Sequence, residues 1–156
     1  MSNIHLVTVI NASAERCFDL SRSIELHMQS TAKTGERAVA GRTLGLAEYG
    51  DTITWEATHF GIRQQLTTKI TAMERPRYFV DEMLKGAFKS IHHKHTFEYQ
   101  AGATIMTDDF HYETPFWILG WLFDVLVLKK YMTGFLLERN SLIKEIAENI
   151  PANAGV

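Results

Sequence analysis

From residue 36 onward the sequence alternates apolar and polar residues with a period of two, and turn residues interrupt the alternation at regular intervals. The interruptions lie at residues 50–51, 60–61, 74–77, 85–86 and 101–102. Because successive side chains of a strand point to opposite faces, this pattern predicts strands with one covered and one wet face. The segment therefore predicts about six antiparallel strands joined by short turns.

Helical signals flank this segment, and one more strand precedes them. Residues 3–10 are rich in β-branched and apolar side chains and predict a short strand. Ser13 and Ser23 are suitable N-caps for two short helices, and residues 116–150 predict one long helix. The expected fold class is α+β, in the order strand, helix, helix, six strands, helix.

A sheet of about seven strands must cover its apolar face, and the chain provides one long helix for that purpose. One helix is too narrow, so we expect a curved, strongly twisted sheet that wraps around the C-terminal helix. Curvature leaves a cavity wherever side chains do not meet. The alternative is a closed core, because three Trp, nine Phe and five Tyr residues provide aromatic volume to fill the space.

Length, charge and cysteine content exclude several classes of protein. A chain of 156 residues is the size of one domain, so we expect a single domain over residues 1–150 and a tail over residues 151–156. The formal net charge of −2 gives no overall attraction for phosphate backbones, so nucleic acid is not an expected partner. The one cysteine, Cys17, lies in an apolar stretch, which favours a buried thiol in a reducing, cytoplasmic environment.

No membrane-crossing segment is expected. Residues 1–11 predict a strand and lack the pattern of a signal peptide. The longest apolar run begins at Phe116 and ends at Leu128, contains Asp124, and is shorter than the roughly 20 residues that span a bilayer.

The same run, residues 116–128, has several interpretations. We favour the interpretation that this run is the first half of the covering helix and is apolar all round because other parts of the protein pack against every side of it. Alternatively, Trp117, Trp121 and Phe123 form an exposed patch that serves as the cavity entrance, as a homodimer contact, or as a membrane-surface contact supported by the adjacent Lys129 and Lys130.

Four segments together with the order of elements resemble the SRPBCC superfamily, over most of the chain from Ile4 to about Ala147. They are INASAERCFDL at 10–20, GDTITWEATHFG at 50–61, ITAMERPRYFVDEMLKGAFKSIHHKHTFE at 70–98 and TIMTDDFHYETP at 104–115. The superfamily includes START lipid-binding domains, birch-pollen-allergen-like proteins and polyketide cyclases, and this chain is similar to a bacterial branch described as ligand-binding or cell-division-inhibitor-like. The resemblance implies a helix-grip fold with an apolar-ligand cavity between sheet and helix. It does not settle catalysis, because the fold hosts carriers, sensors, cyclases and oxygenase domains.

The strand expected at residues 89–100 carries two histidines on its covered face. The period of two predicts that one face holds Ile91, His93, His95, Phe97 and Tyr99. Imidazoles in an apolar interior need hydrogen-bond partners. Asp108 is a candidate partner because it shares a face with Met106, Phe110 and Tyr112, and so are His59 and Asp81. The facing of Asp81 stays open, because both faces of its strand are equally apolar.

Three interpretations of this cluster compete. The first is a buried structural network in which His93 and His95 are satisfied by Asp108 or Asp81. The second is a His–Asp pair acting as general base at a carbon next to a carbonyl, as in a cyclase or dehydratase-type lyase. The third is a metal site, since His-x-His resembles the motif of cupins, but Glu98 lies three residues on and on the opposite face. We therefore expect no metal and no cofactor.

The resulting functional prediction is a protein that binds a small hydrophobic or aromatic ligand, such as a lipid or polyketide-like molecule. The ligand would contact a polar wall and an apolar lining, with Trp117 and Trp121 near the entrance. The predicted polar wall is Trp55, His59, Asp81, His93, His95, Asp108 and Tyr112, and the predicted lining is Ile91, Phe97 and Phe110. Alternatives are the cyclase or dehydratase enzyme, with His93, His95 and Asp108 as catalytic residues, and a partner-binding module that acts through the apolar helix.

Overall fold

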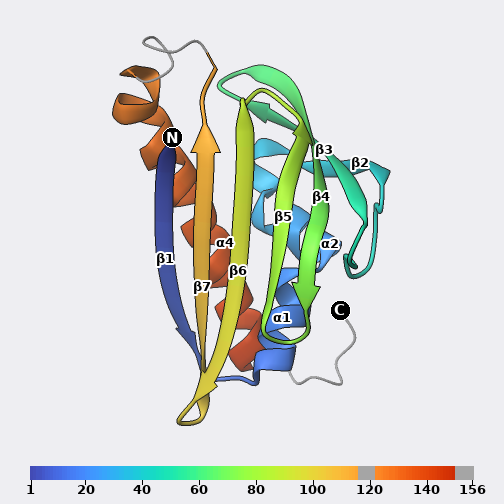
Figure 1. The fold of residues 1–156 in the computed structure, drawn as a ribbon, viewed down its shortest axis with the longest axis vertical. Coiled ribbons are helices and arrows are strands. Elements are labelled where there is room, and N and C mark those ends of the chain that lie inside the picture. The colour runs from blue at the N-terminus through green and yellow to red at the C-terminus, as the bar shows by residue number, and fades with distance from the viewer. Residues whose placement is uncertain (116–121, 150–156) are drawn as a thin grey trace.

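The computed structural model describes residues 1–115 and 122–149, and seven of its strands form one antiparallel sheet. The order across the sheet is β1-β7-β6-β5-β4-β3-β2, as Figure 1 shows. The strand bounds are β1 Ser2–Ile10, β2 Arg37–Gly41, β3 Thr52–His59, β4 Ile62–Glu74, β5 Tyr78–Lys85, β6 Ser90–Gln100 and β7 Ala103–Glu113. The prediction of six strands after residue 36, joined to an N-terminal strand, is confirmed.

Two short helices follow β1, each capped by the serine expected from the sequence. They are α1 Ala14–Ser21 and α2 Ile24–Ser30, and a 3₁₀ turn η1, Ala32–Thr34, follows them. The hydroxyl of Ser13 accepts a hydrogen bond from the backbone N–H of Arg16, and Ser23 accepts one from Leu26, both at 3.3 Å. These bonds satisfy backbone donors that the first helical turn leaves unpaired, which fixes where each helix begins.

The C-terminal helix lies across the covered face of the sheet. It comprises a π-helical turn η2, Asp124–Leu128, and α4 Lys129–Asn149. Helices α1, α2 and α4 lie together on one side of the sheet, and α4 contacts β1, α1 and α2 (Figure 1). The helix predicted over 116–150 is thus confirmed over the described residues 122–149, with a π-helical turn at Asp124–Leu128. Residues 116–121, which include Trp117 and Trp121, and the predicted tail at 151–156 lie outside the described residues.

Strand β7 shows most clearly how the alternating pattern sets the covered face. Every second residue is buried along its whole length, including Met106, Asp108, Phe110 and Tyr112. On β6 the prediction is confirmed for Ile91, His93, His95 and Phe97, which are all buried. The regular pleat therefore carries two imidazoles and one carboxylate into the interior.

Two side chains beside hairpin turns lie on the predicted inner face but are not buried. Tyr99 is 59% exposed. Alternation along residues 62–70 places Ile62 on the same face as Leu66, Thr68 and Ile70, but Ile62 is 63% exposed. Figure 1 shows the β6–β7 turn extending beyond the helices, so no described helix covers the inner face at the end of β6, where Tyr99 lies. Alternation fixes the side of the sheet, and the length of the covering helices decides burial.

The main core lies between α1 and the sheet. Phe18 is fully buried, and its ring packs edge-on against Phe79 and Phe97 at centroid distances of 5.5 and 5.4 Å. Cys17 is a buried free thiol as expected, and burial raises its pKa. Within the described residues, no helix combines the length and the apolar character needed to cross a membrane.

Candidate functional site

A cavity of about 560 Å³ lies between the inner face of the sheet and the helices. Strands β3 to β7 form its wall on one side. Helices α2 and α4 form the other side, together with connecting residues such as Glu36 and Ala47. Most of its wall is apolar, with Ile53, Ile70, Phe79 and Leu136 as examples. The closed-core alternative is therefore wrong, because the aromatic side chains leave this volume open.

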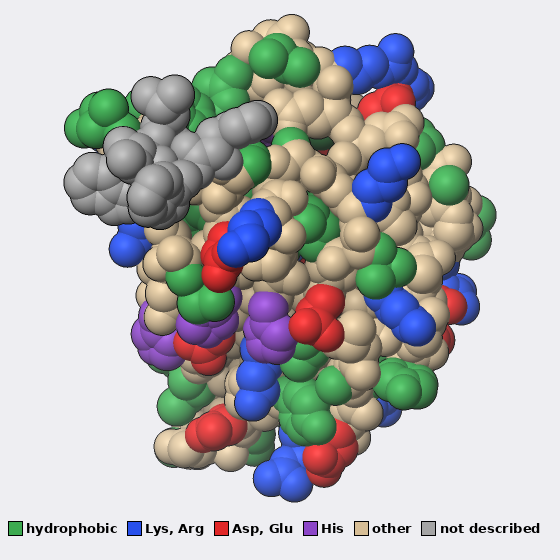
Figure 2. Space-filling view, turned by 45° about the horizontal axis from the view of Figure 1, so that its top comes forward, with side chains coloured by type: hydrophobic (Ala, Val, Ile, Leu, Met, Phe, Trp, Pro, Cys, Tyr) green, Lys and Arg blue, Asp and Glu red, His purple; other side chains and the backbone are tan. Residues whose placement is uncertain are grey.

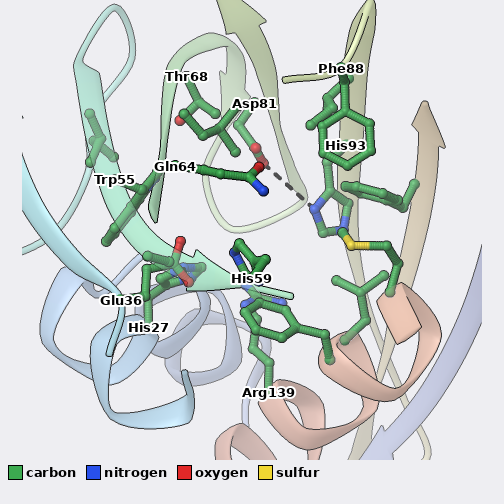
Figure 3. A pocket seen from close by; sticks show the side chains of 18 of the residues that line it. His27, Glu36, Trp55, His59, Gln64, Thr68, Asp81, Phe88, His93 and Arg139 are labelled. Atoms are coloured by element: carbon green, nitrogen blue, oxygen red, sulfur yellow. Dashed lines mark ion pairs between the residues drawn. The ribbon is translucent and has the colours of Figure 1, made fainter. Parts of the chain in front are cut away.

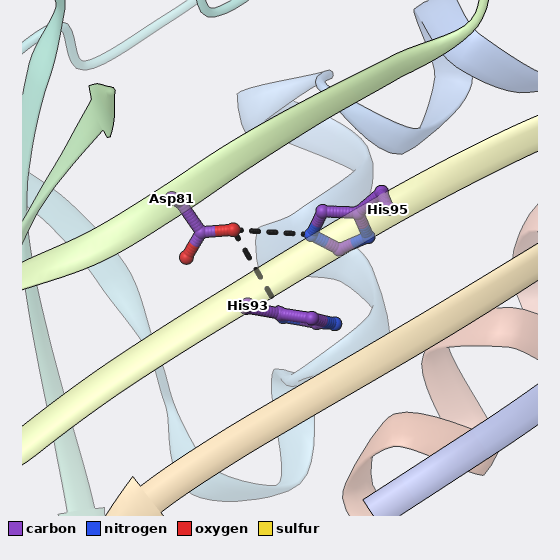
Figure 4. Close-up of side chains that lie close together, drawn as sticks. All are labelled: Asp81, His93 and His95. Carbon is purple, nitrogen blue, oxygen red and sulfur yellow. Dashed lines mark hydrogen bonds and ion pairs between the residues drawn. The ribbon is translucent and has the colours of Figure 1, made fainter. Parts of the chain in front are cut away.

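One polar group on the wall joins β5, β6 and β7. Antiparallel pairing places Asp81 opposite His93, and His95 opposite Asp108. His95 Nε2 lies 3.0 Å from Asp81 Oδ1, and His93 Nδ1 lies 3.9 Å from the same oxygen (Figure 4). On the other side, His93 Nε2–H donates to Asp108 Oδ1 at 2.9 Å. Both histidines therefore lie between the same two carboxylates.

Helix α4 completes this group from behind. Asn140 donates from Nδ2 to Asp108 Oδ2 at 2.7 Å, and Arg139 Nη1 lies 3.6 Å from Asp108 Oδ1. Arg139 also donates to the backbone oxygen of Ser21 at 2.9 Å. Asp108 is fully buried, and nitrogen atoms of His93, Asn140 and Arg139 lie around its carboxylate. The network ties the middle of the sheet to α4 and α1.

The charge states of the cluster follow from its burial and its partners. Burial raises the pKa of Asp108, but hydrogen bonding with His93 and His95 outweighs it and holds the pKa well below its usual range. For Asp81 burial is likewise outweighed, first by the hydrogen bond with His95, and its pKa is lowered. Burial, together with the charge of His95, lowers the pKa of His93 to about 4. At neutral pH the two carboxylates are ionised and His93 is neutral.

A second polar group lies across the cavity and was not predicted from the sequence. His27 on α2 stacks on Trp55 with ring centroids 4.2 Å apart, and its Nε2 lies 3.4 Å from Glu36 Oε2 (Figure 3). The Glu36 side chain is only 8% exposed. Burial raises its pKa, but the nearby His27 outweighs this effect and the net shift is downward. Neither His27 Nε2 nor Glu36 Oε2 has an aligned hydrogen-bond partner among the described residues.

The structure places the other predicted site residues in three locations. Trp55, His59, Ile91 and Phe110 line the cavity together with Asp81, His93 and His95. His59 does not contact the other histidines as expected but forms a 2.8 Å hydrogen bond with the hydroxyl of Tyr131 on α4. Phe97 packs in the core against Phe18, and Tyr112 is 1% exposed and packs against Phe88 and Phe110.

The described part of the apolar run 116–128 exposes four large side chains. Leu122, Phe123, Leu126 and Val127 are between 41% and 67% exposed, whereas Leu128 is buried. The ring of Phe123 contacts Phe60 at the β3–β4 turn, with centroids 5.6 Å apart. Both aromatic residues also line the cavity, so this apolar surface continues into its rim.

Comparison with known proteins identifies the fold. No known protein family and no curated protein matches the chain by sequence. Among solved structures, a START superfamily protein from Mycobacterium smegmatis superposes with a TM-score of 0.71 at 14% identity, covering 96% of this chain and 99% of that one. Ginseng major latex-like protein 151 from Panax ginseng gives 0.68 at 17% identity, with 96% and 98% coverage. The expected helix-grip fold and the resemblance to START-like proteins are therefore confirmed at the level of the fold.

Proposed function

We propose that this protein binds a small hydrophobic or aromatic molecule, such as a lipid or polyketide-like compound, in the cavity between the sheet and α4. The observation that carries the proposal is the cavity itself, whose volume of about 560 Å³ lies within the usual range of ligand pockets. Its wall is mainly apolar, and its carboxylates lie in two groups, Asp81 beside His93 and His95 and Glu36 beside His27, with neutral polar side chains such as Gln64, Thr68 and Tyr131 elsewhere on the wall. That distribution suits a ligand with an apolar body and few polar substituents.

The Glu36 and His27 pair is the proposed contact for one of those substituents. A buried carboxylate oxygen without an aligned donor carries a free-energy cost of about 1–3 kcal/mol. A ligand hydroxyl or amine beside Glu36 would donate to this oxygen and remove the cost. Trp55, stacked on His27, provides a flat apolar surface next to the same position.

We expect a matching ligand to raise the melting temperature by about 5–10 °C when present at about 100 times its dissociation constant. Thermal denaturation across a panel of hydrophobic and aromatic compounds measures this shift, and mass spectrometry of the purified protein detects any co-purifying molecule. Ala57→Phe fills the cavity from β3 and should abolish the shift. Thr58→Phe on the outer face of the same strand is the matched control. Absence of both a shift and a co-purifying molecule contradicts the proposal.

A second prediction concerns the polar contact. Glu36→Gln should weaken binding of a hydroxylated ligand roughly 10–100-fold, because a hydrogen bond to a charged group is replaced by one to a neutral amide. The affinity for the same ligand without its hydroxyl should not change. Glu56→Gln on the outer face of β3, where Glu56 pairs with Arg37 and Arg63, is the control. Equal losses for both ligands would show that Glu36 acts on the shape of the cavity instead.

An enzyme of cyclase or dehydratase type is the second candidate. Its supporting observation is that His93 and His95 line the cavity and both contact carboxylates. A pKa of about 4 makes His93 a weak base at neutral pH, which favours His95 for the role of general base. His95→Gln should then abolish turnover of a bound substrate while its affinity is retained.

We also propose that the apolar run contacts a membrane surface, a second copy of the chain or another protein partner. The exposed side chains of Leu122 and Leu126 support this, as do the exposed Lys129 and Lys130 that follow. Leu126→Asp should abolish flotation with anionic vesicles if the partner is a membrane. It should instead shift the sedimentation coefficient of a dimer if the partner is a second copy.

A cytosolic location is proposed as well, supported by the buried free thiol of Cys17.

A further inference from the structure

Three potential metal ligands converge on one point of the cavity wall. Asp81, His93 and His95 each place one ligating atom within 4.8 Å of the other two. Asp81 Oδ1 lies 3.0 Å from His95 Nε2 and 3.9 Å from His93 Nδ1. In a tetrahedral site with metal–ligand distances of 2.0–2.1 Å, the ligating atoms lie about 3.3 Å from one another. Small side-chain movements would therefore bring these three atoms into that arrangement. We propose that Asp81, His93 and His95 form a binding site for a divalent transition-metal ion.

In each imidazole, the ring nitrogen that faces away from the proposed ion also supports this assignment. His93 Nε2 and His95 Nδ1 lie 2.9 and 2.8 Å from the same oxygen, Asp108 Oδ1. Histidines that bind metals almost always direct their other ring nitrogen at a carboxylate, a backbone carbonyl or water, which fixes the ring orientation. Asp108 does this for His93 by a hydrogen bond and lies close to Nδ1 of His95, and Asn140 holds its second oxygen. The cluster thus contains both the ligands and the residues that orient them.

The hydrogen-bonding capacity of His95 points the same way. A carboxylate oxygen lies about 3 Å from each ring nitrogen of His95, Asp81 Oδ1 from Nε2 and Asp108 Oδ1 from Nδ1. The N–H at Nε2 bonded to Asp81 leaves Nδ1 buried without an aligned partner among the described residues. A metal ion bound to Nε2 would replace the contact with Asp81 and leave Nδ1 beside Asp108 Oδ1.

Charge and access are also those of a metal site. Asp81 and Asp108 bring two carboxylates into the interior, and Arg139 is the one described cation near them, 3.6 Å from Asp108. Asp81, His93 and His95 line the cavity, so an ion would keep its remaining coordination positions toward it. Three protein ligands with open positions are typical of catalytic rather than structural metal sites. Two imidazoles and one carboxylate suit Zn²⁺, Fe²⁺ or Co²⁺.

The experiment is a titration of the chelator-treated full chain with Co²⁺, followed by visible absorption, and with Zn²⁺, followed by calorimetry. We expect one ion per chain. Asp81→Asn keeps an oxygen that accepts from His95 but removes the charge, and it should lower the affinity roughly 100-fold or more, as should His93→Gln. Asp108→Asn should lower it roughly 10–100-fold, as expected for a residue that orients ligands.

The control addresses histidines on the other face of the sheet. Figure 2 shows histidine side chains gathered on that outer face, where the rings of His92 and His111 lie 6.1 Å apart. The double variant His92→Gln/His111→Gln should bind the ion as the unmodified chain does. Binding lost in this variant but retained in Asp81→Asn overturns the proposal, and so does a failure of the unmodified chain to bind either metal.

Two measurements separate metal binding from folding and from ligand binding. Circular dichroism of each variant reports whether it folds. X-ray absorption of the Zn²⁺-loaded unmodified chain counts imidazole ligands without any substitution, and fewer than two overturns the proposal. The hydrophobic ligand panel is run on metal-free protein, so that failure of the proposed carrier function and failure of the metal site give different results.

Discussion

Asp108→Ala is expected to lower the free energy of unfolding by about 3–5 kcal/mol. The Asp108 side chain is fully buried, accepts hydrogen bonds from His93 and Asn140, and lies 3.6 Å from Arg139. Its removal leaves a buried guanidinium without its nearest described counter-charge and two buried donors without an acceptor. Breaking a buried pair from one side costs far more than the intact pair contributes, because the remaining charge stays desolvated.

The neighbouring Asp109 provides a matched control for this prediction. Its side chain points to the outer face and pairs with His5 at 2.6 Å, with both side chains more than a third exposed. Asp109→Ala should therefore cost less than about 1 kcal/mol, since water screens an exposed pair. Urea denaturation of metal-free protein measures both variants, and the midpoint should fall without a change in slope. Equal losses for the two variants would mean that the buried network contributes nothing beyond a surface charge.

The sequence predicted the fold well because the relevant signals are local. The alternation of β7 is complete, and the hydroxyls of Ser13 and Ser23 mark the starts of α1 and α2. Tyr99 and Ile62 obey the same alternation but are exposed, because their burial depends on how far the helices extend over the sheet. How far the helices extend over the sheet depends on the packing of the whole molecule, so the sequences of the two strands do not predict it.

The candidate site was predictable only where one strand determined it. His93, His95 and Asp108 follow from the pleat alone, whereas the facing of Asp81 was open until pairing set it opposite His93. The sequence weighed against metal because Glu98 lies three residues after His95 and on the opposite face, unlike the carboxylate of the cupin motif. In the structure the carboxylate that converges with both histidines is Asp81, on the adjacent strand.

Glu36 shows what sequence reasoning had no means of finding. It lies between η1 and β2, directly after Gly35, whose φ of 62° turns the chain. A left-handed residue at this position redirects the backbone, and Glu36 stands at the very start of the alternating segment, where the pattern is too short to predict the facing of its side chain. Only the packing of α2 against β3, with His27 on Trp55, brings its carboxylate to the cavity.

Phe18→Ala is the second change with a large expected effect, a loss of about 3–5 kcal/mol in the free energy of unfolding. The Phe18 ring is fully buried, packs edge-on against Phe79 and Phe97, and lies 5.4 Å from the guanidinium carbon of Arg22. Truncation removes these contacts and leaves a void that the rigid sheet on one side cannot close. Urea denaturation should show the loss as a lower midpoint.

Phe88→Ala is the comparison variant, because it removes a residue of the cavity wall, whereas Phe18→Ala removes a residue of the core. Phe88 is half-buried, lines the cavity and packs against Tyr112, so its truncation should cost only roughly 1–2 kcal/mol. It should nevertheless weaken binding of a cavity ligand, because it removes part of the apolar wall. Phe18→Ala, titrated under conditions where it remains folded, should bind the ligand with unchanged affinity, since Phe18 supports the fold from α1 and does not line the cavity. Weaker binding by Phe18→Ala together with unchanged binding by Phe88→Ala would contradict this separation of core and cavity.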